Sequence, residues 1–409
     1  MRLLHFTCDG IFSPVLDSQV LTPLRLLGDR CPEMKRGLLV LTSVRHKGKP
    51  QTAEREAYVR SAVPGADIHL RYRPPLAVPM ERRIWSGRLR EVVAEFGEGS
   101  DEPIIVHCRG EGTAAAAAHL KRRDTQLRVV LDLRGASSDE IALRWPLGWW
   151  FRRQYAAGSG KAFAGADGIN AVSRALLEHY RRQGLLRPDV PTTVVGCCVD
   201  TKRFSYDPEV RSARRAELGL EGKFVVCYCG AVSHWQRPDA LAAAFAAVRA
   251  GMPDARFLVI TREPDAFRPH LARAGVDPAD VLFRAAAHHE VSGYLNAADV
   301  ALLLRDDTVT NRVAAPVKFA EYLRAGLPVI LTPYIGDYGD FTRTHDVGRL
   351  VEMPLEPQRV VAVARDLRGR LEREGDAFRR RCSDAAAEHL SWEGQIGRLL
   401  SMYESVAGV

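Results

Sequence analysis

Short apolar runs alternate with longer helix-type runs along most of the chain, and this alternation restricts the possible folds more than any other feature. Such apolar runs indicate strands buried on both faces, and helices between them indicate βαβ units around a parallel sheet. The predicted strands cover residues 2–8, 37–42, 67–72, 103–108, 127–133, 167–172 and 192–196, and then residues 223–229, 255–261, 281–283, 300–304 and 327–331. The predicted helices cover residues 16–27, 54–62, 80–96, 112–123, 238–250, 357–373 and 375–389. We therefore predict an α/β fold with two Rossmann-like halves that meet near residue 200.

Size and composition add a few limits. The chain has 409 residues, which is more than one compact core usually holds, so two domains are expected. No apolar run reaches about 18 residues, and Asp9 interrupts the first apolar run too soon for a signal peptide, so we expect a cytoplasmic protein. The eight cysteines form no pair of C-x-x-C motifs, so we expect no zinc site. The net charge of +8 would suit nucleic acid, a negatively charged substrate or the anionic inner face of the membrane, but no nucleic-acid-binding motif is present.

One stretch of the second half, residues 315–330, places a cation and a carboxylate beside free backbone N–H groups. Pro316 fits the first turn of a helix, where its missing N–H would be unpaired in any case. Lys318 and Glu321 are three residues apart and can share one face near the helix start, and Gly326 fits a left-handed cap. A helix start with these groups can bind a phosphate and a sugar hydroxyl. An ordinary helix-strand unit with a surface ion pair is the alternative.

The same stretch resembles the nucleotide-sugar-binding segment of GT-B glycosyltransferases of the retaining family 4 type, the glycosyl transferases group 1. The shared pattern is small-Pro-x-Lys-x-x-Glu-Tyr-x-x-x-Gly-x-Pro-Val, and its spacing is intact from Ala315 to Val329. The resemblance implies a GT-B fold in which Glu321 binds the ribose hydroxyls of the nucleotide. It also implies that the donor is contacted by Pro316, Val317 and Lys318.

Two further segments resemble the same family and set the expected domain boundaries. Residues 196–204 (Gly-Cys-Cys-Val-Asp-Thr-Lys-Arg-Phe) resemble the crossover between the two domains, although Cys197 and Cys198 depart from the usual form. Residues 391–403 resemble the terminal helix that crosses back to the first domain. We therefore expect an acceptor-binding domain over residues 1–196, a nucleotide-sugar-binding domain over residues 197–388 and a returning helix over residues 389–409, with the reaction in the cleft between the domains.

Gly230, at a strand-to-helix junction, is the expected platform for the donor diphosphate, because such a turn presents free backbone amides. Related enzymes place an arginine directly after this glycine and a lysine-glycine pair before the helix. Here Ala231 holds the arginine position, and Gln236 and Arg237 hold the lysine-glycine positions. Either Arg237 or Lys318 would supply the missing charge, or diphosphate binding is weakened. A plain turn is the structural alternative.

Other phosphate-binding motifs are missing from the sequence. No G-x-G-x-x-G follows a predicted strand and no G-x-x-x-x-G-K-[ST] occurs, which disfavours dinucleotide oxidoreductases and P-loop NTPases. Arg305 and Asn311 lie on the loop that leads to the 315–330 stretch, where they are either donor contacts or surface residues.

Polar residues also follow strands in the first half, at the edge that faces the ligand crevice in open α/β sheets. His107 resembles the histidine that family members place beside the donor sugar, and Arg109 follows it. Asp132 and Arg134, with the later Asp139-Glu140 pair, resemble the Asp-x-Arg-Gly…Asp-Glu segment of bacterial surface-polysaccharide transferases. The structural alternatives are a satisfied core histidine and a strand-end turn with a solvated ion pair.

Two more features concern the acceptor and the membrane. Ser13 and Asp17 follow the first strand, where they could contact the acceptor or cap the next helix. A segment rich in aromatic and basic residues suits a membrane interface, a sugar-stacking groove or a helix contact. Its members are Trp145, Trp149, Trp150, Phe151, Arg152 and Arg153.

Together these features predict a glycosyltransferase that moves a sugar from a nucleotide-diphosphate sugar, with UDP or GDP expected, to a glycan, a lipid-linked sugar or a small molecule. The resemblance implies retention of the anomeric configuration, a role in polysaccharide biosynthesis and no metal. The predicted catalytic residues are His107, Glu321 and Lys318, and the acceptor-side residues are Ser13, Asp17, Arg109, Asp132 and Arg134. A peripheral contact with the inner face of the membrane stays open, and a nucleic-acid partner is disfavoured. The alternatives are a nucleotide-sugar 2-epimerase and a non-catalytic scaffold that binds sugar nucleotides.

Overall fold

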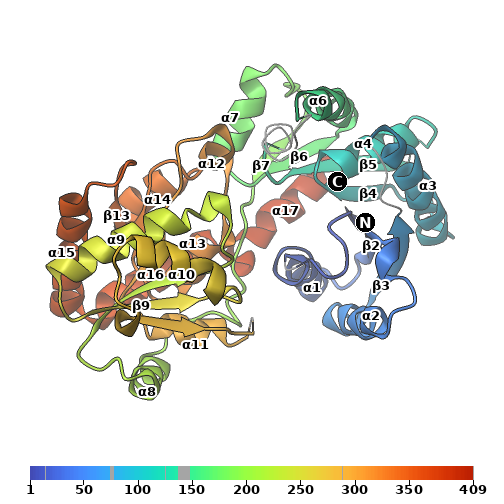
Figure 1. Cartoon of the computed structure of the whole chain (residues 1–409). Coiled ribbons are helices and arrows are strands. Elements are labelled where there is room, and N and C mark those ends of the chain that lie inside the picture. The colour runs from blue at the N-terminus through green and yellow to red at the C-terminus, as the bar shows by residue number, and fades with distance from the viewer. Residues whose placement is uncertain (14, 74–77, 125, 137–147, 288, 409) are drawn as a thin grey trace. The chain divides into compact units, whose positions relative to one another are not determined.

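The chain divides into two compact units (Figure 1). A computed structural model describes residues 1–13, 15–73, 78–124, 126–136, 148–287 and 289–408. Met1–Cys198 together with Gln395–Val409 form what we call the N-terminal unit, and Val199–Gly394 form the C-terminal unit. Of the helices that these residues form, none is both long enough and apolar enough to cross a membrane.

The N-terminal unit is built on a seven-stranded parallel sheet with the strand order β3-β2-β1-β4-β5-β6-β7. Its strands are β1 (Arg2–Thr7), β2 (Lys35–Ser43), β3 (Ala66–Arg73), β4 (Ile104–Arg109), β5 (Leu127–Leu133), β6 (Gly168–Ala171) and β7 (Thr192–Val194). The strand order reverses between β1 and β4, and in open α/β sheets ligands bind beyond the carboxyl ends of the strands at such a point.

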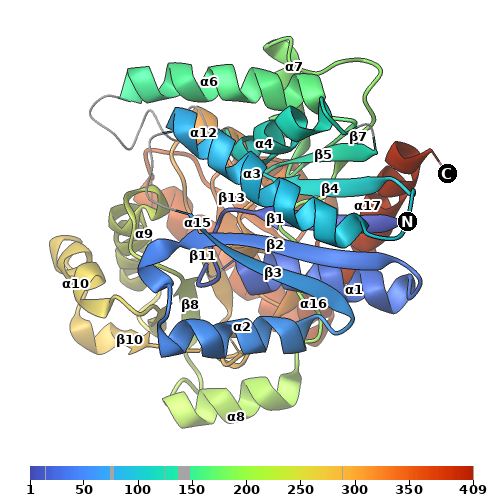
Figure 2. The same ribbon diagram turned by 90° about the vertical axis from the view of Figure 1, so that its right-hand side faces the viewer.

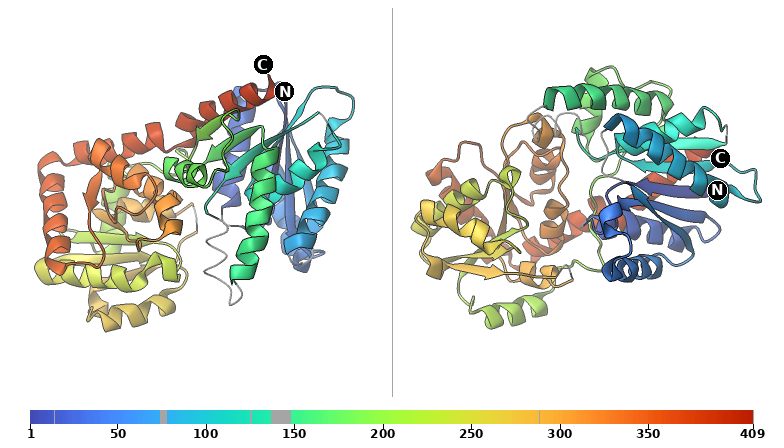
Figure 3. Two further views of the ribbon diagram at one scale, coloured as in Figure 1. Left: turned by 90° about the horizontal axis from the view of Figure 1, so that it is seen from above. Right: turned by 45° about the vertical axis from the view of Figure 1, so that its right-hand side comes forward.

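Helices cover both faces of this sheet. Figure 2 shows α3 lying across the strands, and Figure 1 shows α1 on the other side of the sheet. The helical segments of this unit are η1 (Asp17–Leu21, a single π-helical turn), α1 (Thr22–Arg30), η2 (Val44–His46), α2 (Pro50–Ala62), α3 (Val78–Gly97), α4 (Glu111–Lys121), α6 (Gly148–Gly165) and α7 (Arg174–Arg182). Most of α17 (Trp392–Ala407) also belongs here. In both views of Figure 3 the end of this last, red helix lies close to the N-terminus.

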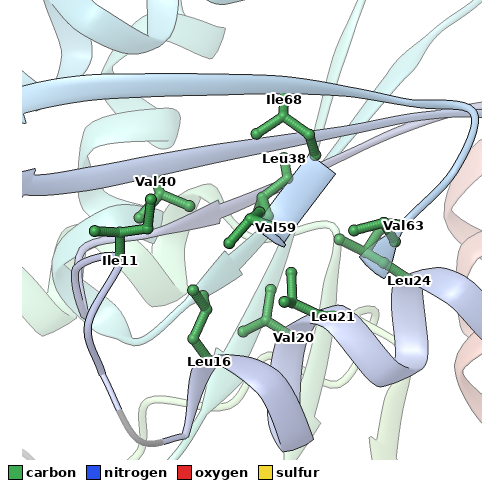
Figure 4. Close-up of a cluster of buried hydrophobic side chains, with 10 residues drawn as sticks. All are labelled: Ile11, Leu16, Val20, Leu21, Leu24, Leu38, Val40, Val59, Val63 and Ile68. Atoms are coloured by element: carbon green, nitrogen blue, oxygen red, sulfur yellow. The ribbon is translucent and has the colours of Figure 1, made fainter. Parts of the chain in front are cut away.

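An apolar cluster packs η1, α1 and α2 against β2 and β3 (Figure 4). Its members are Ile11, Leu16, Val20, Leu21, Leu24, Leu38, Val40, Val59, Val63 and Ile68. Leu38 and Val40 point into this cluster, as alternate residues of one strand should. Gly37 faces the other way, since a Cβ added there would lie 2.9 Å from the Phe96 ring of α3. This alternation explains why the middle of β2 is a continuous apolar run, Leu38 to Leu41.

The C-terminal unit is built on a six-stranded parallel sheet with the order β10-β9-β8-β11-β12-β13. Its strands are β8 (Phe224–Cys229), β9 (Ala255–Ile260), β10 (Val281–Arg284), β11 (Val300–Leu303), β12 (Val329–Leu331) and β13 (Gly348–Leu350). The helical segments are α8 (Pro208–Leu218), η3 (His234–Gln236), α9 (Pro238–Gly251), α10 (Pro264–Arg273), η4 (Pro278–Asp280), α11 (Val291–Asn296), α12 (Val309–Val313), α13 (Val317–Arg324), α14 (Tyr338–His345), α15 (Pro357–Glu374) and α16 (Asp376–His389). The switch in strand order falls between β8 and β11, so this sheet also has one expected binding edge.

The α/β fold with two Rossmann-like sheets of parallel strands, predicted from the sequence, is confirmed. Single elements differ from the prediction. The strand expected over residues 327–331 is shorter, Val329–Leu331, and β13 and several helices, α7, α8, α10, α11, α12 and α14 among them, were not predicted. The helix expected after the first strand begins as the π-helical turn η1 before it continues as α1. Trp145 and the Asp139-Glu140 pair lie outside the described residues, and the rest of the aromatic segment falls in α6.

Candidate active site

The donor residues predicted from the sequence gather at the switch point of the C-terminal sheet. β8 ends at Cys229, β11 ends at Leu303, and the two strands are neighbours. Gly230 directly follows β8, and Arg305 comes shortly after β11. Because ligands of open α/β sheets bind at this edge, the residues around Gly230 form the candidate donor site.

Lys318 of α13 lies directly against Gly230. A Cβ added at Gly230 would lie 2.1 Å from Lys318 Nζ, so any side chain there would displace the ammonium group. The φ of Gly230 is 149°, in the region that favours glycine. Lys318 Nζ lies 3.5 Å from the Tyr228 hydroxyl, which donates a hydrogen bond to the carbonyl oxygen of Ala231 at 2.7 Å. The ammonium group is therefore enclosed by β8 and the turn that follows it.

This enclosure changes the acidity of Lys318. Burial lowers the pKa of its ammonium to about 8, and the nearby guanidinium of Arg305 acts in the same direction, while Cys229 and Glu321 act to raise it. The cation is thus held at a free-energy cost in the ligand-free protein. Such a group stands ready to stabilise an anion, and strongly shifted groups of this kind gather at functional sites.

Glu321 lies one turn further along α13 and is 8% exposed. Its neighbour Tyr322 fixes the helix to the end of β8, because the Tyr322 hydroxyl accepts a hydrogen bond from the Cys229 amide at 2.9 Å and donates to the Cys229 carbonyl at 3.2 Å. Pro316 is the residue before the helix rather than its first residue, which moves the helix start to Val317. The helix therefore carries Lys318 to the Gly230 turn, with Glu321 one turn further along.

Arg237 does not supply free charge to this turn. Its guanidinium donates to Asp239 Oδ2 at 2.8 Å and also pairs with Asp306. Its backbone φ is 51°, and it precedes α9, while Gln236 ends the short helix η3 before it. The Val232 amide of the same turn is occupied as well, since it donates to Glu263 Oε2 at 2.8 Å. Of the two cations predicted as alternatives, the geometry favours Lys318.

Asp132 is the centre of a polar cluster in the N-terminal unit. It is 3% exposed, and its carboxylate accepts hydrogen bonds from Asn170 Nδ2 at 2.7 Å and Arg134 Nη1 at 3.3 Å. The same carboxylate lies 3.4 Å from His107 Nε2 and 3.8 Å from Arg109 Nη1. Burial acts to raise the pKa of Asp132, but Arg134, His107 and Arg109 together hold it well below its ordinary value. The carboxylate is therefore ionised.

His107 presents no free ring nitrogen at the sheet edge. It is 3% exposed, its ring stacks on His5 at a centroid distance of 4.2 Å, and its Nδ1 lies 2.9 Å from the Tyr403 hydroxyl. Burial raises the pKa of Tyr403, so the hydroxyl keeps its proton and can donate a hydrogen bond to Nδ1. With Nδ1 as the acceptor, the ring N–H is assigned to Nε2, which faces Asp132. We predicted that His107 orients the donor sugar directly; the geometry favours a positioning role instead, because both nitrogens already face protein groups.

Replacing Tyr403 with phenylalanine is expected to lower the free energy of unfolding by about 1–2 kcal/mol, because His107 Nδ1 would be buried without a partner. Urea denaturation of both proteins measures the difference. Tyr58→Phe is the control: Tyr58 is 38% exposed, and the change there should stay within about 0.5 kcal/mol. Equal stability of wild type and Tyr403→Phe would show that this hydrogen bond contributes nothing.

The polar cluster includes residues that the sequence analysis missed. His5 lies opposite His107 in the register of β1 and β4, and Asn170 lies opposite Asp132 in the register of β5 and β6. Gln19 accepts a hydrogen bond from Arg134 Nη2 at 3.4 Å. A polar residue in an otherwise apolar strand was the available signal for His5 and Asn170.

Ser13 and Asp17 do not cap the helix that follows them. Leu16 holds the position before η1, and no side chain caps this helix start. Asp17 pairs instead with Arg55 of α2. The acceptor role predicted for Ser13 and Asp17 stays a prediction.

A hollow of about 620 Å³ lies beside the edge strand β13. Its lining includes Thr342, Arg349 and Arg359, but none of the predicted donor residues. Arg349 is paired with Asp346 at 2.9 Å and with Asp366 at 2.7 Å. The Gly230 turn therefore stays the candidate donor site, and this hollow does not include it. Within the described ranges, no group of three or more His, Cys, Asp and Glu side chains is arranged to hold a metal ion.

Comparison with known proteins supports the resemblance seen in the sequence. Residues 223–367 match the family model described as Glycosyl transferases group 1. No curated protein matches the chain in sequence. The matched segment contains the Gly230 turn and all of α13, so the likeness to this family includes the candidate donor site.

Solved structures share the fold over the whole chain. HepE from Anabaena, in complex with UDP and glucose, is 14% identical, with 99% of this chain and 100% of that chain covered and a TM-score of 0.71. Sucrose-phosphate synthase from Thermosynechococcus elongatus is 14% identical, with coverage of 100% and 99% and a TM-score of 0.72. A candidate UDP-N-acetylglucosamine 2-epimerase from Listeria monocytogenes is 14% identical, with coverage of 99% and 96% and a TM-score of 0.62. At these identities the likeness shows the fold.

Proposed function

We propose that this chain is a retaining, GT4-like glycosyltransferase that transfers a hexose-type sugar from a nucleotide-diphosphate sugar to an acceptor. The enclosed ammonium group of Lys318 at the Gly230 turn, with Glu321 on the same helix, carries this proposal. UDP and GDP are the expected nucleotides, and the UDP bound by HepE supports the first of them. The acceptor is a glycan, a lipid-linked sugar or a small molecule, consistent with a role in polysaccharide biosynthesis.

The chemistry assigns a separate task to each group. The bond from the sugar to the diphosphate breaks during transfer, and negative charge develops on the departing diphosphate. Lys318 and the backbone amide of Val317 would stabilise that charge, and Glu321 would hold the ribose hydroxyls. The Gly230 amide, expected as part of the platform, already donates to the Ile260 carbonyl oxygen at 2.9 Å. In the N-terminal unit, Arg109, Asp132 and Arg134 would contact or position the acceptor, with His107 as a positioning residue behind Asp132.

Two other functions remain as alternatives. A nucleotide-sugar 2-epimerase shares the fold, as the Listeria protein illustrates, and would release a rearranged free sugar without an acceptor. A non-catalytic scaffold would bind the sugar nucleotide and leave it intact, and the neutral residues Ala231 and Gln236 in the Gly230 turn favour that alternative. Product analysis separates these three functions.

The test is a binding and hydrolysis screen with UDP-, GDP-, ADP-, CMP- and dTDP-sugars. We expect one nucleotide to raise the melting temperature of the wild type, and we expect Glu321→Ala to lower that nucleotide's affinity by about tenfold or more, because a buried contact to the ribose is lost. Glu217→Ala is the control, since Glu217 is 55% exposed and pairs with Arg214. Failure of every nucleotide to bind the wild type would refute the donor site.

A further inference from the structure

Two cations converge on the Gly230 turn, and neither forms an ion pair with a carboxylate among the described residues. Arg305 is 6% exposed, and its backbone amide donates to Thr332 Oγ1 at 3.0 Å. Its guanidinium donates to the Trp235 carbonyl oxygen through Nη1. Lys318 is the second cation. Among the described residues, the two other buried arginines of this unit both have an acidic partner: Arg370 pairs with Asp346 at 2.8 Å and Arg379 with Asp299 at 2.8 Å.

Burial disfavours the charged form of both cations. Burial lowers the pKa of Arg305 below its ordinary value, with Tyr228 and Tyr322 acting against this effect. Burial also lowers the pKa of Lys318 to about 8, and Arg305 lowers it further. Two neighbouring cations without an acidic partner are unfavourable in a poorly solvated place. A bound anion would relieve both costs at once.

The turn offers little other positive charge. Ala231 and Gln236 are neutral, and Arg237 is already paired with Asp239 and Asp306. The Val232 amide is occupied by Glu263. An anion with two charged groups at this turn would therefore depend on Lys318 and Arg305 for positive charge.

We propose that Arg305 and Lys318 together bind the diphosphate of the nucleotide donor, and that Arg305 is its specific phosphate partner. This inference rests on the proposed function and adds a residue to its site. Only Nη1 of the Arg305 guanidinium donates to a protein acceptor among the described residues, which leaves the other N–H groups for phosphate oxygens. A guanidinium can hold two phosphate oxygens in parallel, and an ammonium adds a point charge. A diphosphate, with charge on both phosphates, matches this pair.

The test is calorimetric titration of the full chain with inorganic pyrophosphate at pH 7.5, in buffer that contains EDTA. We expect Arg305→Gln to weaken pyrophosphate binding by about 10- to 100-fold, and Arg305→Lys to restore part of the loss. Arg312→Gln is the matched control, because it removes one arginine from the same region, where Arg312 is 64% exposed and pairs with Asp307. Its pyrophosphate affinity should stay within about twofold of wild type. Circular dichroism of each variant checks that it folds.

The outcomes separate this inference from the proposed function. Unchanged pyrophosphate affinity in Arg305→Gln, or a wild type that binds no pyrophosphate, overturns the inference even if a nucleotide sugar is turned over. Pyrophosphate binding that requires Arg305, in a protein that neither binds nor consumes any nucleotide sugar, supports the anion site and overturns the proposed function. Titration with UDP and with uridine adds a direct comparison, since Arg305→Gln should weaken the binding of UDP and leave the binding of uridine unchanged.

Discussion

Replacing Asp299 with alanine is expected to lower the free energy of unfolding of the C-terminal unit by about 3–5 kcal/mol, because three arginines would lose their shared carboxylate. Asp299 is 6% exposed and directly precedes β11. Its carboxylate lies 2.5 Å from Arg211 Nη2, 2.8 Å from Arg379 Nη2 and 3.3 Å from Arg215 Nη1. It also accepts a hydrogen bond from the Val225 amide at 2.8 Å. Removal of this one group would leave the three arginines with backbone carbonyl partners but without their anionic partner, and a strand amide without its acceptor.

The pKa of Asp299 fixes the pH range of this effect. Burial acts to raise it, but Arg211, Arg379 and Arg215 hold it below the ordinary value. A carboxyl group with a lowered pKa in the folded protein stabilises that protein at pH values above its unfolded pKa, and this contribution is lost as the pH falls through the folded pKa. The difference between wild type and Asp299→Ala should therefore be full at neutral pH and shrink in acid.

Urea denaturation at pH 7, combined with hydrogen exchange of the peptides that cover β8 and β11, measures this effect and assigns it to the C-terminal sheet. Asp340→Ala is the control, because Asp340 is 80% exposed and makes only a surface ion pair with Arg343. Its effect should stay within about 0.5 kcal/mol. A loss of the same small size in Asp299→Ala would show that the arginines find water or other acceptors in place of the carboxylate.

The alternation of strands and helices was readable from the sequence because parallel strands are buried on both faces. β2 illustrates this: Leu38 and Val40 pack toward α1 and α2, while Gly37 faces α3, so no polar alternation interrupts the run. β13 was not predicted. It has only three residues, Gly348–Leu350, and its Arg349 pairs with Asp346 and Asp366, so it carries no continuous apolar signal.

The residues of the candidate donor site were recognisable in part, because Gly230 and residues 315–330 form local patterns. The partners of these residues were not, since they come from register and packing. Arg305 could be a surface residue by sequence alone, and only its position after β11 makes it a buried neighbour of Lys318. Arg237 shows the reverse: its type suits phosphate, but Asp239 and Asp306 neutralise it.

The N-terminal unit shows the same limit for His107. A histidine near a strand end can face a ligand or the core, and the choice depends on what lies opposite. Here Tyr403 comes from the last helix, almost 300 residues away, and pairs with His107 Nδ1 at 2.9 Å. No local pattern in the sequence around His107 contains that partner.

Replacing Lys318 with methionine is expected to stabilise the ligand-free protein while it weakens nucleotide binding. The folded-state pKa of Lys318, about 8, lies below the ordinary 10.5, so the folded state disfavours the charged form. For a lysine this penalty is present below pH 8 and is relieved as the pH rises from about 8 toward 10.5. Methionine has a similar length and no charge. The free energy of unfolding of the variant should therefore exceed that of the wild type by roughly 1–3 kcal/mol at pH 7, and this difference should shrink by pH 9.5.

Urea denaturation of the ligand-free proteins at pH 7 and pH 9.5 tests whether Lys318→Met raises the free energy of unfolding. Lys202→Met is the control, because Lys202 is exposed, and its free energy of unfolding should stay within about 0.5 kcal/mol of wild type at both pH values. Binding of the preferred nucleoside diphosphate to Lys318→Met should fall by about 30- to 100-fold, because one charged contact to the diphosphate is lost. A variant that is less stable at pH 7 would mean that the contacts of Lys318 with Tyr228 outweigh the cost of its burial.

A variant that gains stability and loses binding has a direct physical meaning. The ammonium group then destabilises the free protein and is compensated only by an anion at the Gly230 turn, which is the arrangement that a site for a departing diphosphate requires.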